Sequence, residues 1–469
     1  MSALLASTIL AIVTQSQVAL RAAPREAAPQ QALLRQGEVL ELRAARGNYL
    51  RVYDLKRERE GYLHTDQVHL TALAPEEAPD LLAVVRFLRD MPGEEALGIS
   101  YAAAYLKAVP PGALTAEPLD AIGTMAERLA RRASAPQPKS VEATISGQLE
   151  VVAELGVTMR SIDQSGGLQI CYDGEAFRRV LRMPAADPAQ LARAALGLTR
   201  HECVDPSLGP TDRYQYDLSR AQILDDVPLE GLDRGLKDRL LMRRAGVLSA
   251  IAFWQSRRGL DPQPAAARAI ADLAGVDKAE LDAAELTEYA DAAVRVGASR
   301  VAAQDTPRHG GKLMVRTAAG RPGETCVSLF EASRPETALV RRCTFGTVWN
   351  ASATGNADGS ALALAVQPLP AWRELWVFRQ GRDGWSVRVL PADSDASAPG
   401  YIEAAGWEPN CKRLLIVRES HLNAHLRRRF EVLRLDTLAT VQQAASPELL
   451  GSFMRWEDPV WQSNTVALR

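Results

Sequence analysis

The hydrophobic pattern changes its period twice along this chain, and no single fold accommodates all three patterns. Residues 14–73 form short runs of strand-favouring residues, residues 74–303 repeat apolar side chains at helical spacing, and residues 304–469 alternate again. Alternation marks half-buried strands, whereas a spacing of three to four marks amphipathic helices. The 469 residues also exceed the roughly 250–300 at which a single core stops growing. The sequence therefore predicts a multidomain protein with a small β domain, an all-α helical middle domain and a C-terminal β domain.

The first β segment, from Val18 to Val68, consists of short strands separated by turn residues. Its runs are V-A-L-R-A-A-P, V-L-E-L, N-Y-L-R-V-Y and G-Y-L-H-T-D-Q-V, and Gly37 stands where a turn needs positive φ. This order resembles the bacterial SH3-like family. A strand run ending in Pro, a mid-domain Gly, an aromatic before V-x-V and a closing G-W-V recur in that family.

The resemblance implies an SH3-like barrel over residues 14–73 that binds or tethers rather than catalyses. Family members often dock cell-wall peptides or partner segments, and the resemblance places the binding residues at Tyr49, Tyr53 and Tyr62. Tyr49 and Tyr62 stand where the family usually has tryptophan. The barrel either binds a peptide through these tyrosines or packs on its own neighbours.

Charge and hydropathy exclude two classes of partner. The net charge of −2, from 55 basic and 57 acidic side chains, gives no electrostatic footprint for nucleic acid. No run approaches the roughly 20 apolar residues of a membrane span.

The apolar segment Met1–Val13 is like the core of a secretory signal but lacks a basic start and a clean cleavage site. It is either a shortened leader, as in an exported protein, or an ordinary first strand.

The five cysteines suggest two local bridges. Cys171 and Cys203 bracket one helical stretch, Cys326 and Cys343 lie on neighbouring predicted strands, and Cys411 is left over. Bridges that close loops of that size would each contribute about 3 kcal/mol of stability in the chain-entropy model. Such bridges persist in an oxidising compartment such as a periplasm. The alternative is five buried thiols in a cytosolic protein.

The middle section predicts ten helices with one hairpin between the fourth and the fifth. The hairpin covers residues 158–172 and turns at Ser165–Gly167. The predicted helices are 79–90, 94–108, 118–134, 141–155, 174–182, 187–200, 212–225, 234–258, 262–274 and 278–297.

The last section contains an apparent repeat of close to 50 residues. Its copies begin at His309, Asp358, Asn410 and Gln462, and a tryptophan precedes three of them. A unit of that length with several strands is typical of propeller blades. The copy Ala405–Glu419 is similar to propeller repeats with W-S-P-D-G-K-x-L, with Cys411 in place of the glycine. The section is either propeller-like or an antiparallel β-sandwich with a fortuitous repeat.

Three fragments resemble active sites without their full context. Glu419-Ser420 is like the catalytic pair of lytic transglycosylases, but Glu419 ends a predicted strand. His421 and His425 lack a third ligand and fall in a predicted hairpin loop. Cys171 and His201 lack the flanking residues of cell-wall cysteine peptidases, and a bridge to Cys203 would consume the nucleophile.

The sequence thus predicts an exported, periplasmic or otherwise secreted binding or scaffold protein with no catalytic residues, no metal and no cofactor. Its partner would be a protein or a cell-wall peptide, and the oligomeric state stays open. The alternatives are a peptidoglycan-directed hydrolase targeted by its SH3-like domain and a structural subunit of an envelope assembly.

Overall fold

The chain forms two compact units. A computed structural model describes residues 9–164, 167–304, 311–392, 398–422 and 425–465. The first unit comprises Met1–Ser207 with Val227–Leu232, and the second comprises Leu208–Asp226 with Asp233–Arg469. The helical region is therefore shared between the two units.

The first unit begins with a seven-stranded antiparallel sheet in the order β3-β2-β6-β5-β4-β1-β7. Its strands are β1 (Leu10–Val13), β2 (Gln17–Arg21), β3 (Gln30–Arg35), β4 (Val39–Arg46), β5 (Tyr49–Asp54), β6 (Arg59–His64) and β7 (Val68–Thr71). Val18, Leu20, Leu50 and Val52 are among the side chains buried on its inner face. The described pairings leave β3 and β7 as edges, so they form an antiparallel sheet and not the closed barrel that the sequence predicts.

Part of the predicted leader segment belongs to this sheet. Residues Leu10–Val13 pair with both β4 and β7, which agrees with the alternative interpretation of an ordinary first strand. Met1–Thr8 lie outside the described residues. Gly37 has φ +87°, as the sequence predicts for a turn at that position.

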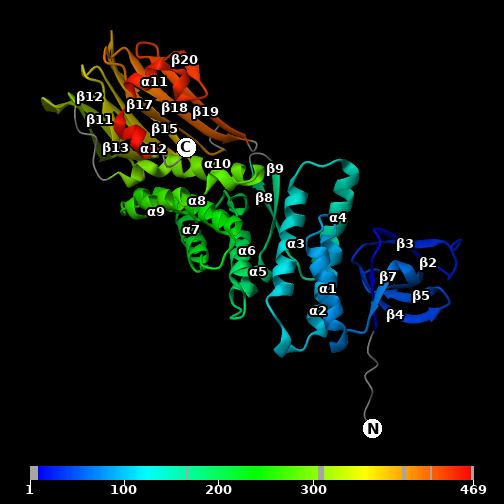
Figure 1. The fold of residues 1–469 in the computed structure, drawn as a ribbon. Helices are drawn as coiled ribbons and strands as arrows, with labels where there is room; N and C mark the ends of the chain where they lie inside the picture. The colour runs from blue at the N-terminus through cyan, green and yellow to red at the C-terminus, as the bar shows by residue number, and fades with distance from the viewer. Residues whose placement is uncertain (1–8, 165–166, 305–310, 393–397, 423–424, 466–469) are drawn as a thin grey trace. The chain divides into compact units, whose positions relative to one another are not determined.

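Four helices of the first unit pack side by side (Figure 1). They are α1 (Ala78–Arg89), α2 (Glu95–Ala108), α3 (Glu117–Ser134) and α4 (Lys139–Glu154). The predicted hairpin is confirmed as β8 (Met159–Gln164) and β9 (Gly167–Tyr172), and its turn residues Ser165 and Gly166 lie outside the described residues. Two shorter helices follow, α5 (Glu175–Leu181) and α6 (Pro188–Leu198).

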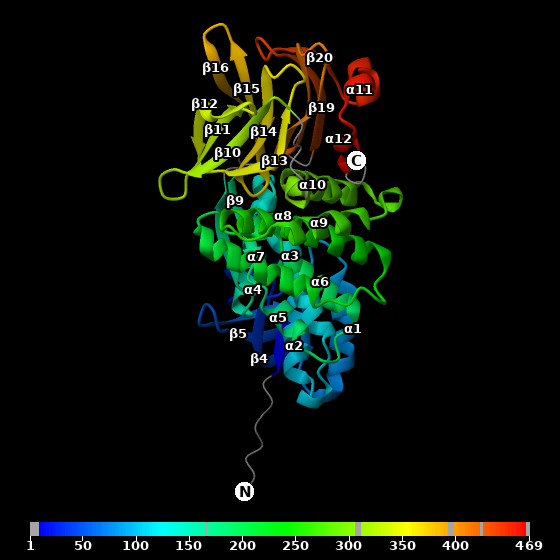
Figure 2. The ribbon, with the colours of Figure 1, turned by 90° about the vertical axis from the view of Figure 1, so that its left-hand side faces the viewer.

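The second unit places helix α10 between other helices and a set of strands (Figures 1 and 2). Its helices are α7 (Pro210–Asp225), α8 (Arg234–Arg257), α9 (Gln263–Ala274) and α10 (Ala283–Ser299), and the short 3₁₀ turn η6 (Arg300–Ala303) follows. The predicted helical middle region is therefore confirmed, with most helix ends within a few residues of the prediction.

The strands of the second unit form a three-stranded and an eight-stranded sheet. They are β10 (Leu313–Ala319), β11 (Thr325–Glu331), β12 (Arg334–Thr344), β13 (Thr347–Gly355), β14 (Ala361–Leu369), β15 (Trp372–Gly381), β16 (Gly384–Leu390), β17 (Gly400–Trp407), β18 (Arg413–Leu422), β19 (His425–Arg434) and β20 (Thr440–Ala444). Within the larger sheet the order is β13-β14-β15-β17-β18-β19-β20, and β16 pairs with β15.

The larger sheet contains strands from more than one of the predicted repeats, such as β14 and β18. Strand β15 joins β17 through a short parallel contact, and all other pairs in the sheet are antiparallel. Val327 and Leu329 of the small sheet share a buried cluster with Leu364 and Trp376 of the large one, so the two sheets are packed together. The described strands thus form two four-stranded antiparallel sets, β13–β16 and β17–β20, which two residue pairs between β15 and β17 join into one sheet.

The last predicted repeat is wrong. The sequence predicts a strand from Gln462 to Arg469, but helix α12 (Pro459–Thr465) occupies its described part and follows helix α11 (Gly451–Trp456). Pro459 opens the helix, and Asp458 Oδ1 accepts a hydrogen bond from the backbone N–H of Val460 at 2.8 Å. Proline at the first helical position after a capping aspartate favours a helix over a strand.

Candidate functional site

The three predicted binding tyrosines lie on one face of the N-terminal sheet. In β5, Leu50 and Val52 are buried, so Tyr49 and Tyr53 point to the opposite side of the strand. In the neighbouring strand β6, Tyr62 is the register partner of Arg51, which lies between the two β5 tyrosines. Strand alternation and register therefore gather the tyrosines on one outward surface, here called the tyrosine face.

Ring contacts fix the two ends of the tyrosine face. The Tyr49 ring meets the His64 ring edge-on, with centroids 5.4 Å apart. The guanidinium carbon of Arg43 lies 5.1 Å from the centroid of Tyr53. Both contacts orient a ring that is half-buried, which leaves part of each ring open to solvent.

The charges of the tyrosine face are paired within it. Arg51 Nε donates to Glu60 Oε2 at 3.0 Å, and this hydrogen bond raises the pKa of the Arg51 guanidinium. Arg51 and Glu60 are both exposed, so water screens their attraction. The face offers amphipathic rings between paired charges, which suits recognition of a partner surface rather than proton transfer.

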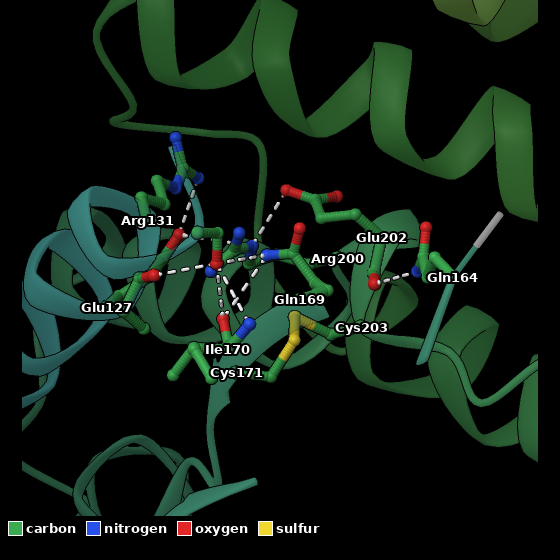
Figure 3. The surroundings of a disulfide bond; sticks show 11 residues. Glu127, Arg131, Gln164, Gln169, Ile170, Cys171, Arg200, Glu202 and Cys203 are labelled. Atoms are coloured by element: carbon green, nitrogen blue, oxygen red, sulfur yellow. Dashed lines mark hydrogen bonds and ion pairs between the residues drawn. A yellow bond between two sulfur atoms is a disulfide. The ribbon is translucent and has the colours of Figure 1, made fainter. Parts of the chain in front are cut away.

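The first predicted bridge joins strand β9 to the 3₁₀ turn η4 (His201–Cys203). Cys171 and Cys203 are paired with an S–S distance of 2.08 Å and a Cα–Cα distance of 5.8 Å. Figure 3 shows Arg200 and Glu202 beside the bridge, where Arg200 Nε donates to Glu202 Oε1 at 2.9 Å. Because the Cys171 sulfur is bonded to Cys203, the thiolate required for a Cys171–His201 dyad is not present.

The second predicted bridge crosses two neighbouring strands, as the sequence indicates. Cys326 of β11 and Cys343 of β12 are register partners and are bonded at 1.97 Å. Glu324 lies near both sulfurs, and these three residues are the only metal-type cluster in the described part of the chain. The two sulfurs are bonded to each other, so they are not thiolate ligands. Cys411 is unpaired and buried.

The glutamate and histidine fragments occupy a strand hairpin. Glu419 lies in β18, is 1% exposed and forms an ion pair with Arg428 of β19 at 2.8 Å. His421 lies on β18, with Nδ1 3.4 Å from Asp291 Oδ1, while the exposed His425 begins β19. The two imidazoles therefore lie on opposing strands and do not share a helix face. The predicted hairpin is confirmed, but both histidines lie on its strands and not in its loop. Asn423 and Ala424 lie outside the described residues.

A buried charge cluster in the second unit is absent from the sequence prediction. Glu403 of β17 accepts from Arg300 Nε at 3.1 Å and from Arg373 Nη2 at 3.1 Å. Trp461 Nε1 donates to the other oxygen of Glu403 at 2.8 Å. Burial lowers the pKa of Arg373 to about 10, against the opposing effect of Glu403. The guanidinium therefore stays charged near neutral pH.

This charge cluster borders a cavity of about 30 Å³. A volume of that size holds about one water molecule. The cluster therefore fastens η6 and α12 to the sheet and offers no room for a substrate. The sequence indicates this charge cluster only through a charged residue at an inward position of a strand, such as Arg373 between Trp372 and Glu374.

Comparison with protein-family models, curated proteins and solved structures finds no match for this chain. Across the described residues, none of the helices combines the length and the apolar character that crossing a bilayer requires.

Proposed function

We propose that this chain is a non-catalytic binding or scaffold protein of an oxidising compartment, such as the periplasm. It would hold a peptide segment of the cell wall on the tyrosine face of its N-terminal sheet. The observation that carries the proposal is the grouping of Tyr49, Tyr53 and Tyr62 on one outward face. Half-buried aromatic rings between paired charges are typical of recognition surfaces.

The compartment is proposed from the cysteines. Four of the five cysteines form two bridges, and disulfides persist mainly in oxidising environments. This chemistry supports export and does not depend on the leader segment.

We also propose fold assignments for the N-terminal sheet and for the C-terminal β region. An SH3-like assignment is supported by the short antiparallel strands and the positive φ of Gly37, although the described pairings leave the sheet open. For the C-terminal region, the two four-stranded antiparallel sets β13–β16 and β17–β20 support a propeller-like assignment.

Co-sedimentation with purified peptidoglycan sacculi tests the proposal. The wild-type chain should sediment with sacculi, and the triple variant Tyr49→Ala, Tyr53→Ala, Tyr62→Ala should lose most of that binding. Tyr216→Ala is the matched control, because Tyr216 is also a half-buried tyrosine but lies on α7 of the second unit. Circular dichroism checks that each variant folds. Sedimentation of the triple variant at the wild-type level would overturn the proposal.

Zymography separates the proposal from a peptidoglycan-directed hydrolase. We expect no clearing of a peptidoglycan gel by the wild-type protein. A clearing band from the wild-type protein that is absent for a Glu419→Gln variant shown to be folded by circular dichroism would show catalysis and would replace the binding proposal.

A further inference from the structure

A pocket of about 440 Å³ lies within the first unit, between its sheet and its helices. Small-molecule sites typically enclose about 300–1,000 Å³, so the volume suits a ligand of modest size. Most of the lining is apolar. Ile12, Val39 and Leu40 line it from the sheet, and Ala104, Val151 and Leu155 line it from the helical side.

Helix α2 presents one regular face to this pocket. On α2 the lining residues are Ser100, Ala103, Ala104 and Lys107, which follow the three-and-four spacing of one helix face. Ile12, Ala104 and Val151 also belong to the main buried core of this unit. The pocket therefore extends from the surface, where Leu55 and Lys107 are exposed, to the buried core of this unit.

Two acidic groups of the lining, Glu38 and Asp54, share one guanidinium. Glu38 is 4% exposed, and its two carboxylate oxygens accept from Arg57 Nη1 at 2.9 Å and from Arg57 Nη2 at 3.0 Å. Asp54 accepts from the same Nη1 at 2.7 Å, and its other oxygen accepts from the backbone N–H of Lys56 at 3.1 Å. A cationic ligand would have to compete with these bonds for either carboxylate.

The remaining polar groups of the lining are also engaged, with one exception. Ser100 Oγ donates to the carbonyl of Gly37 at 2.7 Å. Lys56 forms ion pairs with Glu150 and Glu154. Lys107 is exposed near the end of α2, and no ion pair joins it to another described residue. Lys107 is therefore the one ionisable lining group that is available to a ligand among the described residues.

We propose that this pocket binds a small amphipathic acid, with its apolar body among the core side chains and its anionic group at the Lys107 ammonium. The apolar lining supplies most of the affinity, because burial of apolar surface from water is the dominant favourable contribution. Lys107 sets the preference for an acid over a neutral or cationic group of the same shape. The pocket adjoins one end of the tyrosine face, because Leu10, Glu41 and Tyr53 are register partners. None of the three tyrosines lines it, so this proposal does not rest on the proposed function.

Calorimetry with three ligands that share one tail tests the proposal directly. Dodecanoate, dodecanol and dodecylammonium differ only in the head group. We expect one dodecanoate per chain and the affinity order dodecanoate, dodecanol, dodecylammonium. Failure of dodecanoate to bind the full chain, or tighter binding of dodecylammonium, would overturn the proposal.

Two variants with matched controls locate the site. Ala103→Phe fills the pocket and should weaken dodecanoate at least tenfold, whereas Ala153→Phe on the exposed side of α4 should not. Lys107→Met should weaken dodecanoate by up to about fivefold, the range of an exposed ion pair, and leave dodecanol unchanged. Lys139→Met, at another exposed helical lysine, should change neither. Unchanged dodecanoate affinity in a folded Ala103→Phe variant would show that the ligand binds elsewhere.

Discussion

The hydroxyl of Ser100 donates a hydrogen bond to the backbone carbonyl of Gly37, 63 residues earlier in the chain, at 2.7 Å. The same hydroxyl lies 2.9 Å from the carbonyl oxygen of Ala96, one turn back on helix α2. This contact joins the turn before β4 to the first helices. It depends on the absence of a side chain at Gly37, because a Cβ there would lie 2.9 Å from both the Ala96 carbonyl oxygen and Ser100 Oγ.

Gly37→Ala should therefore destabilise the first unit by about 2–4 kcal/mol. About 1 kcal/mol comes from the left-handed backbone at φ +87°, and the remainder comes from steric overlap in a well-packed contact. Urea denaturation followed by circular dichroism measures the change. Gly47→Ala is the control, because Gly47 also has positive φ, at +62°, but no atom lies within 4 Å of its added Cβ. Equal losses in the two variants would contradict the role of close approach.

Glu403→Gln should destabilise the second unit by about 3–5 kcal/mol. The substitution leaves the guanidinium groups of Arg300 and Arg373 buried without a counter-charge, and an unpaired buried charge is costly. Thermal and urea unfolding of the variant measure the loss. Glu336→Gln removes an exposed carboxylate from β12 and should change stability by less than about 0.5 kcal/mol. A similarly small loss for Glu403→Gln would mean that the cluster is rehydrated at little cost.

The helices could be predicted from the sequence because the signals that define a helix are local. The predicted helix 187–200 is α6, and Asp187 caps it by accepting from the Gln190 backbone N–H at 2.8 Å. Capping residues, prolines and apolar spacing all lie within one segment of sequence. Alternation likewise places Tyr49 and Tyr53 on the same side of one strand, whereas Tyr62 joins them only through the register of β5 with β6.

The remaining features depend on contacts between distant segments. Arg300 and Glu403 are 103 residues apart, and no local pattern indicates that they meet. The pocket likewise requires α2 and α4 to lie beside the sheet. The false last repeat has a different cause, because Asp458 and Pro459 start a helix that the similarity to earlier strands concealed.

The native protein should contain one free thiol, and that thiol should be unreactive until the chain unfolds. Cys171–Cys203 and Cys326–Cys343 are bridged, and Cys411 is only 7% exposed. Under non-reducing conditions a maleimide should label no site in the folded chain and Cys411 alone in urea. Labelling of five sites in urea without a reductant would contradict both bridges.

Removing either bridge should lower stability, and the longer loop should matter slightly more. The sequence separations are 32 residues for Cys171–Cys203 and 17 for Cys326–Cys343. The chain-entropy model gives about 3–4 kcal/mol for each bridge. Urea unfolding of the two double-alanine variants should show that order. The reverse order by more than about 1 kcal/mol would mean that native packing outweighs loop entropy.

Asp291 should contribute stability at neutral pH that is lost in acid. Burial alone would raise the pKa of Asp291, but Arg295 and His421 lower it by more, so it lies below the ordinary value of 3.8. A carboxyl whose folded pKa is depressed stabilises the native state above its unfolded pKa. That contribution disappears as the pH falls below about 4 towards the folded pKa.

Asp291→Asn should therefore cost about 2 kcal/mol near pH 7, the scale of a hydrogen bond to a charged group such as the one from Arg295 Nε at 2.6 Å. The difference from wild type should shrink as the pH falls below about 4. Urea unfolding at a series of pH values measures it. Asp383→Asn, at an exposed turn of the same unit, should show no such dependence. A stability difference for Asp291→Asn that grows as the pH falls below about 4 would contradict the depressed pKa.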